Sequence, residues 1–566
     1  MESKLNKTSK FSLTALQLLI ISLLVLGVFF RFVNLDRKVY WIDETSTSLR
    51  ISGYTELELI QEFQEGDFRN GNIVSVDDLL KYQRPNPEKD LADTIKVLAG
   101  RPEHTPLYYL MARFWVQWFG SDVAAIRSLS AVISLLAFPC IYWLCKELFD
   151  SSLVGWIAIA LVAISPFHVL YAQEARQYSL WIVTILLSSA ALLRAMRVKT
   201  KLSWGVYAAT VALGLYSHLF YALVAISHAI YVAVIERFRL TKTVTAYLLS
   251  SLAGVIAFVP WVLVIINDGK QSNLREATSW AYSNPTLLSL IKSWLVSLSR
   301  VFFDLDRGWC FGLESSYCRY PLSLHDPLIY WIFPLVIFVG YSIYFLCRKA
   351  PQQAWLFILS LVGVTALATI LPDIVLGGQR SAMTRYFIPC LLGIQLAVAY
   401  CLAVKTNFVY KNIWKQKIWK FCMVVLFSIG ILSCAVSSQA EAWWNKIHNY
   451  DTFPISRIIN KAERPLLLYR FSNKFGTNGN YVMPLAHLLE PKVQIMFLFQ
   501  DDETPKIPDS FSDIFVIKPT KKFQNSIKER QDYTIKLVYD PKVELKTGFN
   551  MPTRTVWKIE KVKNNT

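Results

Sequence analysis

The chain has 566 residues, of which 54% are hydrophobic, 14% are aromatic and only 18% are charged. A water-soluble chain of this length keeps about 25% charged residues, because polar groups must cover its surface. These proportions and a mean hydropathy of +0.34 exclude a disordered chain, a collagen and a coiled coil. They indicate that lipid surrounds most of the protein.

The formal net charge is +18, from 59 basic and 41 acidic residues. A charge of this size is also typical of nucleic-acid-binding proteins, so its position along the chain decides between the two classes. In residues 1–440 most of the basic excess lies in short gaps between apolar runs, which is the pattern of cytoplasmic loops. We therefore expect membrane lipids, and no nucleic acid, as partners.

The first apolar run, Phe11 to Phe30, follows three lysines and so resembles a signal peptide. Its length of about twenty residues and the absence of a small-x-small cleavage site favour an uncleaved first span. Similar runs recur along the chain and predict about eleven transmembrane helices. These runs lie near residues 11–32, 122–145, 152–171, 178–196, 203–217, 219–235, 244–266, 327–347, 353–371, 386–404 and 418–437. With the N-terminus inside, every basic loop falls in the cytoplasm.

The stretch from Leu107 to Phe119 is apolar enough to be mistaken for another span. If this stretch were counted as a span, all the later basic loops would lie outside the cytoplasm. It has about thirteen residues, is rich in Trp and Tyr and carries Arg113, so it fits a helix lying in the membrane interface.

This layout leaves outer segments at residues 34–122, at residues 267–326 and after residue 438. The first outer loop carries helix signals, because Ser75 and Asp78 form a capping-box pattern and Asp90 to Leu98 is closed by Gly100. In the second loop, Cys310 and Cys318 are either joined by a disulfide or free.

The tail, residues 441–566, is polar and carries strand-like runs. These are PLLLYR, VQIMFLF, DIFVIK, TIKLVY and TRTVWKI, with helical stretches near 481–489 and 523–530 between them. We expect a mainly α polytopic membrane module over residues 1–440, with interfacial helices in its first outer loop, and a small extracytoplasmic α/β domain over residues 441–566.

The strongest candidate site is the acid pair Asp43-Glu44, which follows Trp41 just after the first span. Two adjacent carboxylates beside lipid are costly unless they have a partner or a task. In the functional interpretation Asp43 is a general base and Glu44 positions a partner group or a metal. In the alternative, the pair caps a helix over Thr45 to Ile51.

A second cluster precedes the interfacial helix and contains Glu103, His104, Pro106 and Tyr108. Pro106 suits the first turn of that helix, so His104 lies at its N-terminal edge, where backbone N–H groups attract anions. A phosphate could bind there, and His104 with Glu44 could hold a metal. The alternative is a polar cap on a surface helix.

A third cluster lies at an outer turn between two spans and comprises Gln173, Glu174, Arg176 and Tyr178. Glu174 and Arg176 are too close in sequence to share a helical face, so they point to different partners. Arg176 could bind a phosphate with the two-pronged geometry of its guanidinium, or it could extend to lipid headgroups.

Further candidates at the same outer level are His218, Arg380, Arg385 and Tyr386. Arg385 starts a helix that runs back into the membrane, where it is well placed for a lipid phosphate. The sequence has no GxxxxGK[ST] loop, GxGxxG, HExxH or GxSxG motif. Nor do the apolar runs hold the chains of ionisable residues that mark an ion path, which favours chemistry at the outer surface.

Together these motifs resemble the GT-C membrane glycosyltransferases, in particular the protein O-mannosyltransferase group and the bacterial aminoarabinose transferases of lipid A. The resemblance covers about residues 10–440 and rests on the acid pair, the HTPLYY stretch from His104, YAQEARQYS from Tyr171 and RYFIP from Arg385. It departs from the aminoarabinose transferases at His104, where those have Lys.

The resemblance implies a GT-C fold and transfer of a sugar, with inversion, from a polyprenyl-phosphate donor outside the cytoplasm. Asp43 would take the proton of the acceptor hydroxyl, and Glu44 would orient that site. Residues implied in binding the donor phosphate are His104, Arg176, Arg380 and Arg385. Residues implied in binding substrate are Trp41, Glu103, Tyr108, Gln173, Glu174, Tyr178, His218 and Tyr386. A divalent metal would be optional.

We therefore expect a glycosyltransferase of a bacterial plasma membrane whose sugar and acceptor (protein, glycan or lipid) are left open. One alternative is a transporter or flippase of lipid-linked sugars, which predicts discontinuous spans with polar residues at the midplane. Another is a receptor or scaffold in which the tail carries the function.

Overall fold

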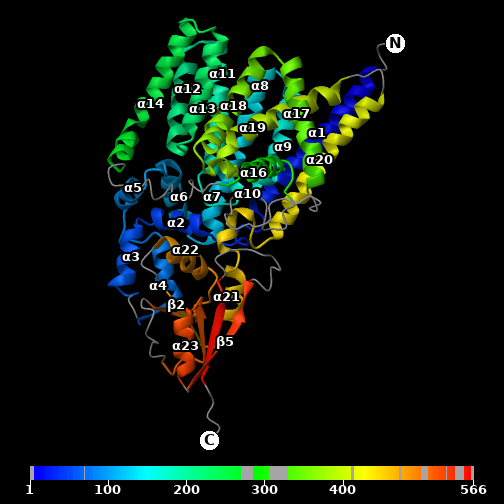
Figure 1. Ribbon diagram of the computed structural model, residues 1–566. Coiled ribbons are helices and arrows are strands. Elements are labelled where there is room, and N and C mark those ends of the chain that lie inside the picture. The colour runs from blue at the N-terminus through cyan, green and yellow to red at the C-terminus, as the bar shows by residue number, and fades with distance from the viewer. Residues whose placement is uncertain are drawn as a thin grey trace.

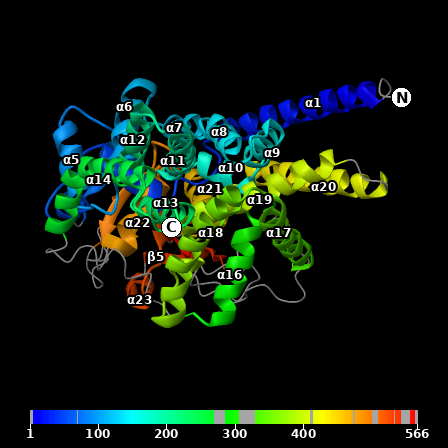
Figure 2. The ribbon, with the colours of Figure 1, turned by 90° about the horizontal axis from the view of Figure 1, so that it is seen from above.

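The computed structural model describes residues 5–68, 71–268, 285–304, 329–408, 413–470, 475–498, 508–530, 532–541 and 554–561. Cys310 and Cys318 lie outside these residues. Figure 1 shows long helices at one end, a sheet at the other and short helices of the first outer loop between them. Figure 2 shows α1 and α20 extending from the other helices on the same side.

The apolar runs of the sequence form helices, and the expected second outer loop adds one more over residues 287–299. These are α1 (Leu5–Phe32), α7 (Val123–Leu135), α8 (Ala137–Phe149), α9 (Ser152–Ala163), α10 (Pro166–Ala172), α11 (Tyr178–Val198), α12 (Lys201–Ser217), α13 (Tyr221–Ile235), α14 (Lys242–Asp268), α16 (Leu287–Ser299), α17 (Ile329–Lys349), α18 (Gln352–Val375), α19 (Ile388–Asn407) and α20 (Ile413–Gln439). Helices α11 and α19 are buried nearly all round, whereas α14 and α17 expose apolar side chains, as lipid-facing helices do.

The mainly helical, polytopic architecture is confirmed, but the count of eleven spans is not. Within the described residues, 7 helices are long and apolar enough to cross a membrane, or 8 if the bent pair α9 and α10 is one span. Helices α12 and α13 have only 17 and 15 residues. The pair α9 and α10 bends by 62° just before Pro166, which lacks the N–H that a continuous helix would need.

The first outer loop folds into α2 (Ile42–Ile51), α3 (Glu56–Gln64), β1 (Ile73–Ser75), α4 (Val76–Leu80), α5 (Leu91–Ala99) and α6 (Pro106–Phe119). The predicted capping box forms, because the Asp78 carboxylate accepts a 2.7 Å hydrogen bond from the Ser75 N–H while Ser75 Oγ accepts one from the Asp78 N–H. Asp90 caps α5 in the same way.

The tail forms the predicted strands. They are β2 (Pro465–Arg470), β3 (Gln494–Leu498), β4 (Asp513–Ile517), β5 (Tyr533–Tyr539) and β6 (Val556–Lys561). Helix α21 (Thr452–Asn460) precedes β2, and α22 (Phe475–Ala486) and α23 (Lys521–Glu529) lie between strands. The strand order is β1-β3-β2-β4-β6-β5, in which β2 is parallel to β3 and β4. The central strand β2 is buried along almost its whole length, as strands covered on both faces are.

The sheet is not built from the tail alone. Strand β1, from the first outer loop, pairs antiparallel with β3, with Val74 opposite Ile495. Nearby, Phe63 of α3 packs edge-to-face against Phe497 of β3, with ring centroids 4.7 Å apart. The first outer loop and the tail therefore share one hydrophobic core.

The short helix η6 (Trp444–Asn449) lies at the start of the tail, just after α20. The indole N–H groups of Trp443 and Trp444 both donate to Asp304 Oδ2, at 2.8 and 2.7 Å. The Arg300 guanidinium lies 3.5 Å from the centre of the Trp444 ring. These contacts fix the start of the tail against the end of α16.

Candidate functional site

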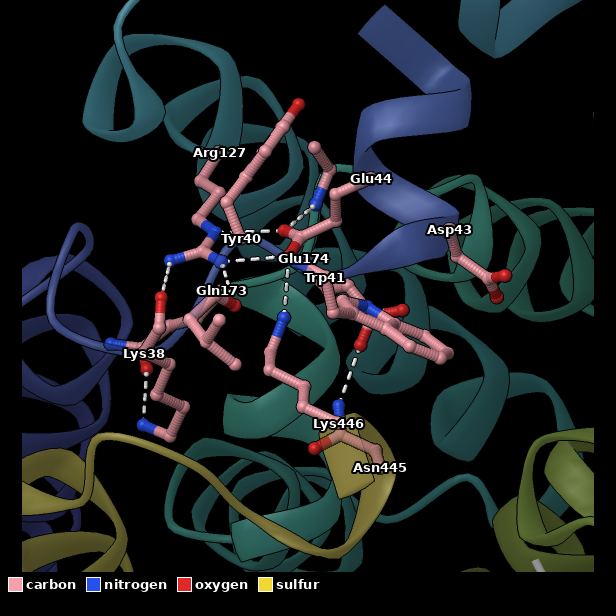
Figure 3. A network of polar contacts seen from close by, with 12 residues as sticks. Lys38, Tyr40, Trp41, Asp43, Glu44, Arg127, Gln173, Glu174, Asn445 and Lys446 are labelled. Carbon is pink, nitrogen blue, oxygen red and sulfur yellow. Dashed lines mark hydrogen bonds and ion pairs between the residues drawn. The ribbon is translucent and has the colours of Figure 1, made fainter. Parts of the chain in front are cut away.

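The acid pair lies in the first turn of α2, where the helix dipole favours negative charge. Trp41 precedes the helix, and its N–H lies 3.4 Å from the Glu44 carboxylate. Figure 3 shows that the carboxylates of Asp43 and Glu44 point in different directions from α2. The two acids therefore have separate surroundings although they are neighbours in the sequence.

Glu44 is completely buried and is bound on both of its oxygens. Arg127 of α7 donates to Oε1 and Oε2, at 2.7 Å each, Lys446 Nζ lies 2.5 Å from Oε2, and the Ala175 N–H donates to Oε1 at 2.9 Å (Figure 3). Burial raises the pKa of Glu44, but Arg127 and Lys446 outweigh it and lower the pKa to about 2. Glu44 is thus an ionised anchor that joins α2, α7 and the tail.

Asp43 is accessible, with 29% of its side chain exposed. Its Oδ2 lies 3.9 Å from Nη1 of Arg385, and its backbone oxygen accepts a 3.0 Å hydrogen bond from Thr47. The structure therefore places a partly exposed carboxylate beside a cation, in the same helix turn that Glu44 holds in place.

The loop between α10 and α11 supports this turn through residues with different partners, as their spacing predicts. Gln173 donates to the backbone oxygens of Phe30 and Val33, at 2.8 Å each. Glu174 Oε2 accepts from Asn445 at 2.6 Å, and Arg176 Nη1 lies 3.2 Å from the Tyr109 hydroxyl. The loop therefore connects the end of α1, the tail and α6.

Glu174 differs electrostatically from Glu44. It is fully buried, and its Oε1 has no hydrogen-bond partner among the described residues. Burial raises the pKa of Glu174 to about 7, with Lys446 acting against burial and Glu44 and Asp43 acting with it. The protonated and ionised forms of the Glu174 carboxyl are therefore both populated near neutral pH.

Two arginines beside Asp43 keep unused donors. Arg176 is 4% exposed, and Nε of Arg176 and of Arg385 is buried without a hydrogen-bond partner within the described part of the chain. Buried donors are normally paired, so these atoms fit an anionic ligand. Tyr178 and His218 flank the arginines, and His218 stacks on Trp181 at 4.1 Å.

Other predicted residues have different surroundings. Arg380 pairs with Asp373 at 3.1 Å, and Tyr386 packs against Phe220. The Tyr108 hydroxyl bonds Ser130 at 2.8 Å. Trp41 is 4% exposed, with Lys446 Nζ 5.8 Å from its ring centre.

His104 lies 3.8 Å from Glu103. Burial, assisted by Arg50 and Arg176, holds the pKa of His104 well below its ordinary value, so the ring is neutral and carries no charge for a phosphate. Both Glu44 oxygens are bound to cations or to an N–H group, so Glu44 and His104 do not form a metal pair here. No group of three or more metal-ligating side chains occurs among the described residues.

Sequence reasoning missed Arg127, Lys446, Asn445 and Lys38. Arg127 offered a signal, because an arginine near the start of an apolar run is expensive without a buried acid partner. Lys38 bonds Gln173 at 3.2 Å, and burial, with Lys446 and Arg127, lowers its pKa to about 7. Lys446 and Asn445 lie in a polar segment that gave no sign of contact with the acid pair.

Fold and site together define a polytopic helical membrane protein with a carboxylate–arginine centre between the long helices and a small α/β unit (Figure 1). Residues 103–264, less than half of the chain, match the family model for dolichyl-phosphate-mannose-protein mannosyltransferase. This match confirms the expected resemblance to the mannosyltransferase group over that segment, which includes His104, Arg176 and His218.

Two solved structures are similar to the chain. One is ArnT from Cupriavidus metallidurans bound to undecaprenyl phosphate, with 12% identity and a TM-score of 0.47, covering 96% of this chain and 98% of that chain. The other is the same protein in the apo state, with 12% identity and a TM-score of 0.48, covering 97% and 98%. None of the curated proteins compared with the chain matches it.

Proposed function

We propose that the protein is a membrane glycosyltransferase that moves a sugar from a polyprenyl-phosphate donor to an acceptor hydroxyl. The reaction would invert the anomeric centre and take place on the extracytoplasmic side of a bacterial plasma membrane. The observation that carries the proposal is the accessible Asp43 carboxylate, 3.9 Å from Arg385, beside two arginines with unused buried donors.

Asp43 is the general base in this mechanism. Its partial exposure leaves room for an incoming hydroxyl, whose proton it accepts as the oxygen attacks the anomeric carbon. Glu44 does not react, because Arg127 and Lys446 occupy its carboxylate. Its task is to hold the first turn of α2 so that Asp43 faces the substrate.

Arg385 and Arg176 neutralise the departing lipid phosphate. Their unpaired Nε–H groups supply hydrogen bonds that strengthen as negative charge develops on the leaving oxygen. A monophosphate leaving group needs less compensating charge than a diphosphate, so with two guanidinium groups a metal is optional. The donor named by the matched family, a dolichyl phosphate sugar, belongs to the same chemical class.

The transporter alternative is supported by one specific feature, the discontinuous pair α9 and α10 with its 62° bend. Beside the bend, buried His168 lies 2.8 Å from Gln395 of α19, which is a polar contact within the helical part. A transporter would carry its lipid-linked sugar across a bilayer without breaking the bond between sugar and phosphate.

The deciding experiment incubates purified protein with a panel of polyprenyl-phosphate sugars and measures free polyprenyl phosphate by mass spectrometry. A glycosyltransferase releases it from at least one donor, with water or an added alcohol as acceptor. A parallel measurement in proteoliposomes follows movement of the intact donor between leaflets. Movement without release would contradict the proposal and favour the transporter.

A further inference from the structure

The face of α2 that carries Asp43 continues to the end of the helix. Asp43, Thr47 and Arg50 are spaced by four and three residues, so their side chains lie along one side of α2. Arg176 lies on this side, because its Nη1 is 3.4 Å from both the Asp43 backbone oxygen and Thr47 Oγ1. Arg50 therefore lies on the same side as Asp43, about 10 Å further along the helix axis.

The guanidinium of Arg50 is buried and only partly paired. Arg50 is 7% exposed, and its Nη2 lies 3.7 Å from Glu56 Oε1, while Arg101 donates to Glu56 Oε2 at 2.6 Å. One carboxylate thus serves two guanidinium groups. Nη1 of Arg50 is buried without a hydrogen-bond partner among the described residues. The last turn of a helix favours a cation, but helix polarity does not account for a buried, unpaired N–H group.

The segment just before α6 adds two more unpaired polar atoms. The His104 N–H donates to the Arg101 backbone oxygen at 3.0 Å, so the residue that binds Glu56 also fixes the start of this segment. His104 Nδ1 and Thr105 Oγ1 are buried and have no hydrogen-bond partner in the described part of the chain. Burial and, after it, the charge of Arg50 lower the pKa of His104, which agrees with the closeness of the two side chains.

These atoms are connected to the acid pair by direct contacts. The rings of His104 and Tyr109 lie 5.8 Å apart, and the Tyr109 hydroxyl accepts a 3.2 Å hydrogen bond from Arg176, which also contacts the Asp43 backbone. Asp43 and His104 are both partly exposed, so a ligand can reach each end of this row of residues. The row therefore extends the site beyond the groups that the proposed reaction uses.

We propose that Arg50, His104 and Thr105 form a second anion-binding subsite, which holds an acidic group of the substrate while the reacting atoms lie at Asp43. This inference rests on the proposed glycosyltransferase function and specifies its substrate class. Arg50 supplies the charge, and the other two side chains supply hydrogen bonds. The Glu103 carboxylate lies 3.8 Å from His104 Nε2 and would repel an anion there, so the acidic group is assigned to the Arg50 side of the ring.

The ligand of this subsite is a carboxylate or phosphate group, carried either by the transferred sugar or by the acceptor. The test uses the full-length protein and two matched substrate pairs. The first pair is the neutral form and the uronic acid form of one sugar on the same polyprenyl phosphate, with glycerol as acceptor. The second pair is glycerol and glyceric acid as acceptors, with the neutral lipid-linked sugar.

We expect the wild type to prefer the acidic member of one pair, measured as the ratio of the two kcat/KM values. Arg50→Gln should lower this ratio about 10- to 100-fold, as loss of a hydrogen bond to a charged group does. A ratio that falls in the first pair assigns the acidic group to the sugar, and one that falls in the second pair assigns it to the acceptor. An unchanged ratio in both pairs would overturn the subsite, as would a wild type that prefers both neutral members.

Three further variants separate this role from a structural one. Arg84→Gln is the matched control and should leave the ratio unchanged, because Arg84 belongs to the same outer loop and pairs with Asp77 at the surface. Arg50→Lys keeps the charge and should retain part of the preference. Thr105→Val removes the unpaired hydroxyl at nearly constant shape and should lower the ratio several-fold, so it tests the subsite even if Arg50→Gln does not fold.

Ligand binding distinguishes failure of the subsite from failure of the proposed function. Melting temperatures measured with each member of the two pairs require no turnover. If the wild type releases no polyprenyl phosphate but is stabilised more by an acidic member, and Arg50→Gln is not, glycosyl transfer fails while the subsite stands. If release occurs without a preference for an acidic member in either transfer or binding, the subsite fails while the proposed function stands.

Discussion

Glu44 and Arg127 form a two-point ion pair in which neither side chain has any exposed surface. Two parallel hydrogen bonds of 2.7 Å fix the relative orientation of α2 and α7 across 83 residues of sequence. Asp43, one residue earlier, depends on this pair for its direction. Glu44 therefore holds the helix turn, and in the proposed mechanism Asp43 faces the substrate.

Replacing Glu44 with Gln should therefore destabilise the fold. The change leaves Arg127 and Lys446 buried without a counter-charge, a situation that costs about 3–5 kcal/mol. Thermal unfolding of the purified protein in detergent measures the loss, and Asp43→Asn is the matched control, because Asp43 is partly exposed. Equal melting temperatures for wild type and Glu44→Gln would contradict the anchoring role.

Loss of Arg385 should impair use of the donor more than use of the acceptor. In the proposed mechanism Arg385→Ala removes a cation that stabilises the leaving phosphate, and a single such donor contributes about 3 kcal/mol, or about 100-fold in rate. Steady-state kinetics with varied donor and acceptor measure both effects, with Arg457→Ala, an exposed residue of α21, as the control. A larger effect on the acceptor would move Arg385 to the acceptor side.

Arg176→Ala should act in the same direction and also lower stability. The Arg176 guanidinium also has a structural role, because it donates to the Tyr109 hydroxyl at 3.2 Å and lies 3.4 Å from the Asp43 backbone oxygen. Comparing melting temperatures of Arg176→Ala and Arg385→Ala separates the two contributions. If Arg176→Ala alters stability alone, with normal donor kinetics, the residue has no part in binding phosphate.

The raised pKa of Glu174 predicts that the stability of the folded protein depends on pH. Its pKa rises from 4.5 to about 7 in the folded state, chiefly through burial, so the folded protein binds this proton more tightly than the unfolded chain. The contribution of Glu174 to stability is complete below about pH 4.5, falls as the pH rises toward 7 and is constant above that.

Glu174→Gln cannot titrate and serves as the reference. Between pH 5 and pH 7.5, the wild type should lose melting temperature relative to Glu174→Gln. If the melting temperature of the wild type minus that of Glu174→Gln stays constant or rises between pH 5 and pH 7.5, Glu174 remains ionised in the fold.

The sequence predicted the elements that arise from local pattern. The strands of the tail follow from short apolar, β-branched runs, and the helices of the first outer loop follow from capping signals at Ser75 and Asp90. Asp43 could be singled out because a carboxylate pair at the end of a span needs a reason to be there.

The features that could not be predicted from the sequence depend on contacts between residues that are distant in the chain. Lys446 meets Glu44 across 402 residues, and strand β1 has only three residues, too few for any periodicity. The sequence could not show that Glu44 is buried and Asp43 partly exposed, because the partners that bury Glu44 come from α7 and the tail. The bend before Pro166 falls inside an apolar run, where Ser165, Pro166 and His168 were the signals of a break.

The most direct test of the account compares the rates at which wild type and Asp43→Asn release polyprenyl phosphate from the same lipid-linked sugar. A general base contributes about 10²- to 10⁴-fold, so we expect Asp43→Asn to lose at least that factor while it keeps its melting temperature and its affinity for the donor. Turnover at the wild-type rate by folded Asp43→Asn would contradict the assignment of Asp43 as the base.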